Sequence, residues 1–148
     1  MIDCGKGYQE ALDELAHWDN PAISAITWME LYGGADVDDI PRLDDFMADF
    51  GIEIIEVDAE IMQAAAKLVS ERRRHGPKIP LPDAIIQATA DIKGLTIITR
   101  NTKDFKGRNV RVPYRLETVT TVRVIDVDPP GDTPTPKHIG GPILTRMR

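Results

Sequence analysis

The chain has 148 residues, of which 42% are hydrophobic and 28% are charged, a length and composition that suit one globular domain with a single core. No run approaches the roughly 20 apolar residues of a membrane span, no signal peptide opens the sequence, and the lone cysteine, Cys4, excludes a disulfide framework and Cys-pair zinc sites. A net charge of −6 argues against a protein that coats nucleic acid, but not against a nuclease, because bound cations reverse the sign of an acidic site.

The first half of the chain is predicted to alternate helices and strands. Helices are indicated by apolar residues three or four apart, and strands by short runs rich in β-branched residues. In chain order, these elements are a helix over 8–18, a strand over 22–26, helices over 27–32 and 38–50, and a strand over 52–57.

The second half continues the alternation. In order, it holds a helix that Asp58 caps and Gly76-Pro77 ends, a helix over 83–93 between Pro82 and Gly94, a strand over 95–98, and late strands over 110–112 and 119–127. Strands alternating with helices predict an α/β fold with three α/β/α layers and a central parallel sheet.

The composition changes at Pro129, where a segment rich in proline and glycine begins. Such a segment cannot bury enough apolar surface to order itself, and it ends in a short mixed stretch over 143–148. We therefore expect a folded domain over 1–127 and a disordered tail over 128–148.

Three carboxylates fall where α/β sheets bind ligands. Glu30 is predicted in the first turn of the helix after the strand over 22–26, Asp83 in the first turn of a later helix, and Asp104 in the loop after the strand over 95–98. The carboxyl ends of the strands and the amino ends of the helices share the edge at which ligands bind. We expect the three acids to meet there.

Close carboxylates favour a bound cation. Two unit charges about 4 Å apart repel by roughly 4 kcal/mol at an effective dielectric near 20. Mg²⁺ and Mn²⁺ prefer oxygen ligands, and such an ion polarises a phosphoryl oxygen and stabilises the leaving oxygen. The acids therefore predict phosphodiester hydrolysis that depends on Mg²⁺, with Mn²⁺ as an alternative.

Each acid also has a structural explanation. Glu30 fits a capping box that begins at Thr27, Asp83 beside Pro82 complements the helix dipole, and Asp104 is an ordinary loop acid. Separate structural roles would not require all three to converge on one edge.

Basic residues near Asp104 are candidates for phosphate contacts, and so are those at the end of the helix that Asp58 caps, although the latter also suit a solvated helix end. They are Lys103, Lys106, Arg108 and Arg111 in the first group and Arg72, Arg73 and Arg74 in the second. The three histidines show no spacing typical of metal ligands.

Three segments resemble motifs of the VapC-type toxins of the PIN-domain family. Residues 22–35 are similar to the second motif, a strand followed by Thr-x-x-Glu-Leu. Residues 82–90 are similar to the third, an Asp that opens an Ala-rich helix, and residues 97–105 to the fourth, Thr-x-Asn-x-x-Asp-Phe. Their order and spacing also match, and the resemblance covers about residues 2–116.

The resemblance implies the toxin of a type II toxin–antitoxin system, an Mg²⁺-dependent endoribonuclease that hydrolyses RNA phosphodiester bonds in the cytoplasm. Its implied partners are the RNA substrate, a cognate antitoxin and a second copy in a homodimer. Glu30, Asp83 and Asp104 take the places of the family's metal-binding catalytic acids. The candidate substrate-binding residues are Thr99, Arg100, Asn101 and Lys103.

The beginning of the chain departs from the family. The family opens with a strand that ends in Asp-Thr-Asn-x-Leu-Ile, whose Asp is the first metal ligand, whereas residues 1–6 resemble the segment directly after that strand. Asp3 is not assigned as a ligand. We expect the first strand and first acid to be absent, as a late start codon or a truncated gene would explain, and two strand edges to lack a partner.

Two other functions compete with the nuclease. A catalytically impaired PIN-like module would bind antitoxin or RNA without cleavage, and the absent first acid favours it. A phospho-receiver domain needs an acceptor Asp at the end of a central strand and a Lys at the end of a later one, and these strand ends do not provide that pair.

Overall fold

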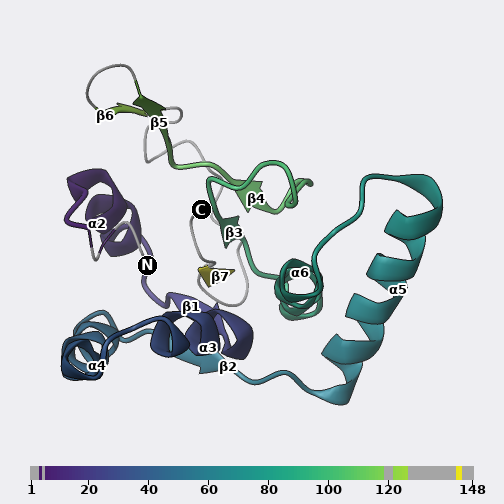
Figure 1. The fold of residues 1–148 in the computed structure, drawn as a ribbon, viewed down its shortest axis with the longest axis horizontal. Helices are drawn as coiled ribbons and strands as arrows, with labels where there is room; N and C mark the ends of the chain where they lie inside the picture. The colour runs from purple at the N-terminus through teal and green to yellow at the C-terminus, as the bar shows by residue number, and fades with distance from the viewer. Residues whose placement is uncertain (1–3, 5, 119–121, 127–142, 145–148) are drawn as a thin grey trace.

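The central sheet consists of five parallel strands in the computed structural model, which describes residues 4, 6–118, 122–126 and 143–144, with side chains as far as residue 116. Their order across the sheet is β2-β1-β7-β3-β4 (Figure 1). The strands are β1 Ala22–Ser24, β2 Glu53–Ile55, β3 Ile97–Ile98, β4 Val110–Arg111 and β7 Ile143–Leu144. This arrangement confirms the predicted α/β class and parallel sheet.

Helices cover both faces of the sheet, which gives the three predicted layers. Figure 1 shows α2 (Gln9–Ala16) and α4 (Ile40–Asp49) on one side and α6 (Leu81–Lys93) on the other. The two adjacent residues of β3 point to opposite faces, as the period of a strand requires. Ile98 joins the core cluster of α2 and α4, and Ile97 joins that of α6.

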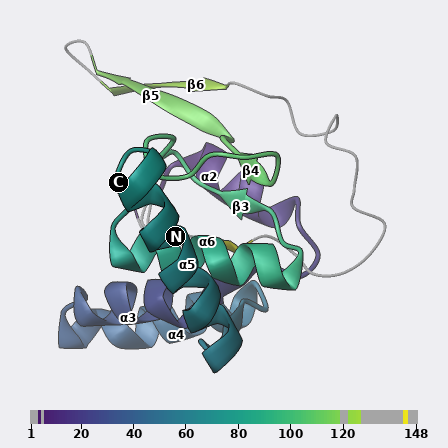
Figure 2. The ribbon, with the colours of Figure 1, turned by 90° about the vertical axis from the view of Figure 1, so that its right-hand side faces the viewer.

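A β-hairpin that the sequence analysis did not predict as a whole stands off from the body (Figure 2). Its strands, β5 (Tyr114–Thr118) and β6 (Val122–Asp126), pair antiparallel in a sheet of their own. The predicted strand over 119–127 overlaps β6, although 119–121 and 127 lie outside the described residues. Tyr114, 1% exposed, belongs to the core cluster on the α2 side and ties the base of the hairpin to the domain.

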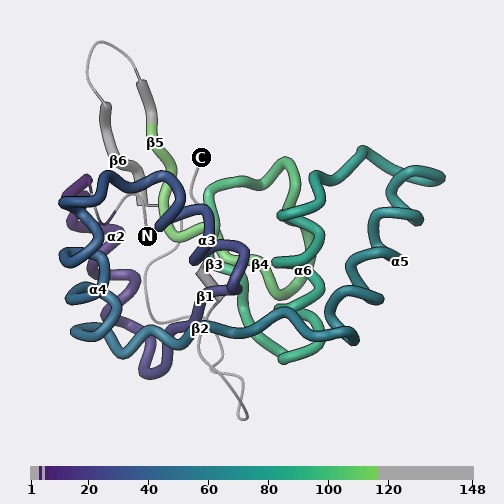
Figure 3. The backbone as a smooth tube through the Cα atoms, turned by 60° about the horizontal axis from the view of Figure 1, so that its bottom comes forward, coloured from purple at the N-terminus to yellow at the C-terminus, as the bar shows by residue number. Residues whose placement is uncertain are grey.

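Helix α5 (Ala59–His75) packs along α6 on the side away from the sheet (Figure 3). The Asp58 side chain caps it, accepting a hydrogen bond from the Ile61 N–H at 2.9 Å. Gly94 ends α6 in the left-handed conformation, with φ +66°, which glycine adopts without steric cost. Within the described residues, no helix is long and apolar enough to cross a membrane.

Helix α3 (Ala25–Gly33) begins two residues before its predicted start. The Ser24 hydroxyl accepts a hydrogen bond from the Ile26 N–H at 3.3 Å and caps the helix. Thr27 is therefore inside the helix and the predicted capping box is wrong. Glu30 lies in the second turn of α3, not the first. The predicted helix over 38–50 starts with a short 3-10 turn, η1 (Val37–Asp39), before α4.

The expectation that two strand edges would lack a partner is wrong. Strand β7 lies between β1 and β3 and pairs with both. It belongs to the predicted tail, so at these two residues the chain is part of the sheet and not a disordered extension. The rest of that tail, 128–142 and 145–148, lies outside the described residues.

Candidate functional site

The acids of interest are carried by three elements that lead away from one edge of the sheet. Because the strands are parallel, their carboxyl ends share that edge. Helix α3, with Glu30, starts directly after β1, and the loop with Asp104 follows β3. Asp83 lies in the first turn of α6, a helix that packs on one face of the sheet as in other α/β folds.

One core cluster joins these elements. It contains Ile86 of α6 and Phe105 of the loop after β3, with Ile26 of α3 packed against it. Ile86 lies three residues after Asp83, and Phe105 is adjacent to Asp104. Ile26 lies four residues before Glu30, so each acid is adjacent to, or one helical turn from, a residue of this cluster.

The two aspartates of this edge are buried although their side chains are charged. Asp83 is 6% exposed and Asp104 is 8% exposed, whereas Glu30 is half-buried. Burial of a carboxylate is costly unless polar or cationic groups compensate for the lost water. Two buried carboxylates on converging elements are therefore more typical of a functional site than of a structural core.

A pair of hydrogen bonds fixes Asp104 to Asn101. The Asn101 side chain donates from Nδ2 to Asp104 Oδ2 at 2.9 Å, and its Oδ1 accepts from the Asp104 N–H at 3.3 Å. Thr99, which is fully buried, holds the start of the loop through its hydroxyl, which accepts from the Asn101 N–H at 3.0 Å. Thr99 and Asn101 thus orient the carboxylate of Asp104.

Comparison with known proteins identifies the family of the chain. The sequence profile of the PIN domain matches residues 5–108. This chain belongs to the PIN domain family. A solved structure described as a toxin-antitoxin complex from Klebsiella pneumoniae is similar to this PIN domain, with 38% sequence identity and a TM-score of 0.64 over 76% of this chain and 91% of that one. No curated protein matches the chain.

PIN domains are generally nucleases that use divalent metals. The donor types fit, because carboxylate and amide oxygens suit Mg²⁺, which is often held by only one or two carboxylates. Thr27 Oγ1 and Gln87 Oε1 are buried with no hydrogen-bond partner among the described residues. They lie three residues before Glu30 and four after Asp83, so unsatisfied polar atoms occur beside two of the acids.

The three carboxylates are predicted to meet at one edge of the sheet. Among the residues that the structure describes, no group of three or more His, Cys, Asp or Glu side chains is close enough to hold a metal ion. The structure brings the elements of the three acids to one edge of this PIN domain, but it does not bring all three carboxylates into one ligand set.

The basic residues predicted to surround Asp104 divide into two groups. Lys103, Lys106 and Arg108 are exposed. Arg111 is instead buried in an ion pair with Glu14, with Nε–Oε1 and Nη2–Oε2 distances of 2.8 and 3.1 Å, so it is not available for phosphate contact. The Arg100 guanidinium lies 5.9 Å from the centre of the Tyr114 ring.

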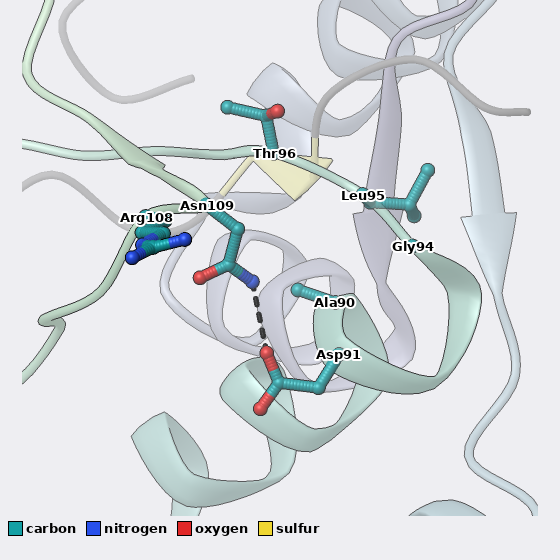
Figure 4. Close-up of a pocket in the computed structure, with 7 residues that line it drawn as sticks. All are labelled: Ala90, Asp91, Gly94, Leu95, Thr96, Arg108 and Asn109. Carbon is teal, nitrogen blue, oxygen red and sulfur yellow. Dashed lines mark hydrogen bonds between the residues drawn. The ribbon is translucent and has the colours of Figure 1, made fainter. Parts of the chain in front are cut away.

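A separate pocket lies at the other end of α6 (Figure 4). It is lined by Ala90, Asp91, Gly94, Leu95, Thr96, Arg108 and Asn109. Asp91 Oδ1 accepts hydrogen bonds from Asn109 Nδ2 at 2.8 Å and from Gln87 Nε2 at 2.9 Å. Eight residues of helix, about 12 Å, separate Asp91 from Asp83, so this pocket is not the acidic site.

Sequence reasoning missed two buried polar features. Gln87 is 6% exposed and lies one turn from Asp83 on α6, and its four-residue spacing from that acid was the available signal. The buried pair of Glu14 and Arg111 joins residues 97 positions apart, and nothing in the spacing of a single sequence indicates such a contact.

Proposed function

We propose that this chain is the toxin of a type II toxin–antitoxin pair and an Mg²⁺-dependent endoribonuclease acting in the cytoplasm. The observation that carries the proposal is the burial of two aspartates, Asp83 and Asp104, in a PIN domain, where their neighbours Ile86 and Phe105 share one core cluster. The related solved structure, described as a toxin–antitoxin complex, supports an antitoxin as partner. A homodimer remains part of the proposal through the resemblance to VapC-type toxins.

In the proposed mechanism, Asp83 and Asp104 would hold a divalent cation, and Glu30 of α3 is the third candidate acid. When bound, the cation supplies Lewis-acid polarisation of the scissile phosphate. Asn101 keeps the Asp104 carboxylate in one orientation through its two hydrogen bonds. Water adds to the phosphorus and the P–O bond to the leaving oxygen breaks, so the backbone is hydrolysed without a protein nucleophile.

Glu30, Asp83 and Asp104 are carried to one edge of the sheet, here called the acidic edge. Exposed lysines next to it are suited to hold the RNA backbone. Lys103 precedes Asp104 directly, and Lys106 lies two residues after it. Phosphate contacts of this kind position a nucleic acid without reading its sequence. We therefore assign Lys103 to substrate binding, with Arg100 and Asn101 as the other candidates from the same loop, whereas the fully buried Thr99 acts by holding the loop.

One observation favours a second candidate function, a PIN module that binds antitoxin or RNA without cleaving RNA. Among the described residues, the acidic side chains do not form a group of three within reach of one metal ion. An enzyme with too few ligands would bind Mg²⁺ weakly and cleave slowly.

The deciding experiment compares Asp83→Asn with Asp91→Asn in cleavage of an end-labelled RNA pool of mixed sequence, with Mg²⁺ or with a chelator. Both substitutions remove one carboxylate from α6, but only Asp83 lies at the acidic edge. We expect Asp83→Asn to lose at least about 100-fold in rate, the upper end of the range for outer-shell partners of a metal, and Asp91→Asn to stay close to wild type. Cleavage that resists the chelator, or equal loss in both variants, would contradict the nuclease proposal, and no cleavage by wild type would favour the binding module.

A further inference from the structure

The central position of the sheet is held by the segment that lies farthest along the chain. Strand β7 pairs in parallel with β1, where Ala22 and Ile23 face Ile143 and Leu144, and with β3. The β3 partners are Ile97 for Ile143 and Ile98 for Leu144. In the described sheet, β1 and β3 do not pair with each other, so β7 is the only link between the β2-β1 and β3-β4 halves.

The chain is long enough for this strand to come from the same molecule. Residues 127–142 connect β6 to β7, and sixteen residues span up to roughly 50 Å when extended. Strand β3 and its parallel neighbour β7 are joined by residues 99–142, more than the dozen or so that a parallel crossover requires. The connection therefore meets the length requirement for insertion in cis.

The strands on either side of β7 are among the most buried of the domain. Ile23, Ile97 and Ile98 are each no more than 1% exposed. Backbone N–H and C=O groups in such strands have no access to water, so they need a partner strand on each side. Removal of β7 would leave the inner edges of β1 and β3 without one.

The position of β7 also sets the width of the acidic edge. Strand β1 leads into α3 with Glu30, and β3 leads into the loop with Asp104. Neighbouring strands lie roughly 4.8 Å apart, so the strand between them separates β1 from β3 by about 10 Å. The strand between them therefore determines how far apart the elements that carry Glu30 and Asp104 begin.

We propose that Ile143–Leu144 form a fold-closing strand that is inserted in cis, and that this C-terminal segment joins the two halves of the sheet and sets the spacing of the acidic edge. The proposal stands on the sheet pairing alone and does not depend on nuclease activity.

A cysteine-pairing experiment tests the register directly in the full-length chain. In a Cys4→Ser background, Ile98→Cys is combined with Leu144→Cys, two residues that are strand partners. The control combines Ile98→Cys with Ile139→Cys, which lies outside β7 in the same segment. Aligned neighbours in a sheet fall within the Cα distances that a disulfide spans.

We expect the Ile98–Leu144 pair to form an intramolecular disulfide under mild oxidation at least tenfold faster than the control pair, with a rate independent of protein concentration. Mass spectrometry of the linked peptides gives the assignment. No link above the control would overturn the proposal, and a link found only between two chains would overturn its cis insertion.

Hydrogen exchange provides a second test that does not need cysteines. Ile143→Asp with Leu144→Asp in the full chain is compared with Ile139→Asp. We expect peptides covering β1 and β3 to exchange at least tenfold faster in the double variant, and those covering α5 to change less. Unchanged protection of β1 and β3 would overturn the proposal, and general unfolding of the double variant alone would support the closing role of the strand.

Discussion

Asn101 is the residue of the acidic edge whose role is most sharply defined by its hydrogen bonds. Its amide group contacts Asp104 twice, once at the carboxylate and once at the backbone N–H. We predict that Asn101→Ala lowers Mg²⁺-dependent RNA cleavage by about 10- to 100-fold, the usual loss for a group that orients a metal ligand. Asn109→Ala is the matched control, because it also removes an amide that bonds an aspartate, but at the far end of α6.

The Mg²⁺ dependence of the rate distinguishes orientation from simple loss of stability. If Asn101 orients a ligand, the variant should need more Mg²⁺ for half-maximal rate while its urea midpoint stays near that of wild type. An unchanged Mg²⁺ requirement with a lower urea midpoint would show that the residue only stabilises the loop.

The buried ion pair between Glu14 and Arg111 is expected to contribute to stability through the cost of breaking it. Trp18 Nε1 also donates to Glu14 Oε1 at 3.0 Å, so the carboxylate is held from two sides. Glu14→Ala leaves a buried guanidinium without its carboxylate, and we predict a loss of about 3–5 kcal/mol in the free energy of unfolding, measured by urea denaturation.

An exposed ion pair serves as the control for that prediction. Arg42 and Asp39 lie 3.0 Å apart on the surface, with side chains 83% and 53% exposed, and Arg42→Ala should change stability by less than about 1 kcal/mol. Equal effects of Glu14→Ala and Arg42→Ala would show that the burial of the first pair has no energetic consequence.

At the level of elements, the cap of α5 gives a clean test of local sequence signals. The Asp58 carboxylate accepts from the Ile61 N–H, and we predict that Asp58→Ala lowers the free energy of unfolding by about 1 kcal/mol. Asp36 is a suitable control, because it precedes η1 without a capping hydrogen bond from its side chain. A similar loss in Asp36→Ala would mean that the effect comes from charge and not from the cap.

The predicted helices match the structure where local sequence signals agree, and they differ where a neighbouring element sets the end of the helix. Asp58 before α5 and Gly94 after α6 marked real helix ends, because caps act within one turn. The start of α3 was misplaced because Ser24, at the end of a strand, is also the cap. Strand β5 was missed although Tyr114 and Leu116 alternate with polar residues, the period of a half-buried strand.

At the level of the whole molecule, the sequence predicted the layers but not the order of the strands. The alternation of strands with helices predicted a parallel sheet. Asp83 became a candidate because it lies at a helix start, and Asp104 because it lies after a strand end. The place of β7 had no signal, because a two-residue strand is too short for periodicity and comes after a segment rich in proline.

A metal that binds the folded chain must stabilise the whole domain, which gives the nuclease proposal a test apart from activity. Ligand at about 100 times its dissociation constant raises the free energy of unfolding by about 2.7 kcal/mol, and each kcal/mol raises Tm by roughly 3 °C at this size. We predict that Mg²⁺ raises Tm by several degrees in wild type and in Asp91→Asn, and by less than half as much in Asp83→Asn and Asp104→Asn. The chelator should abolish the difference. An equal shift in all four proteins would place the ion elsewhere, because among the described acids only Asp83 and Asp104 are both buried and carried to the acidic edge.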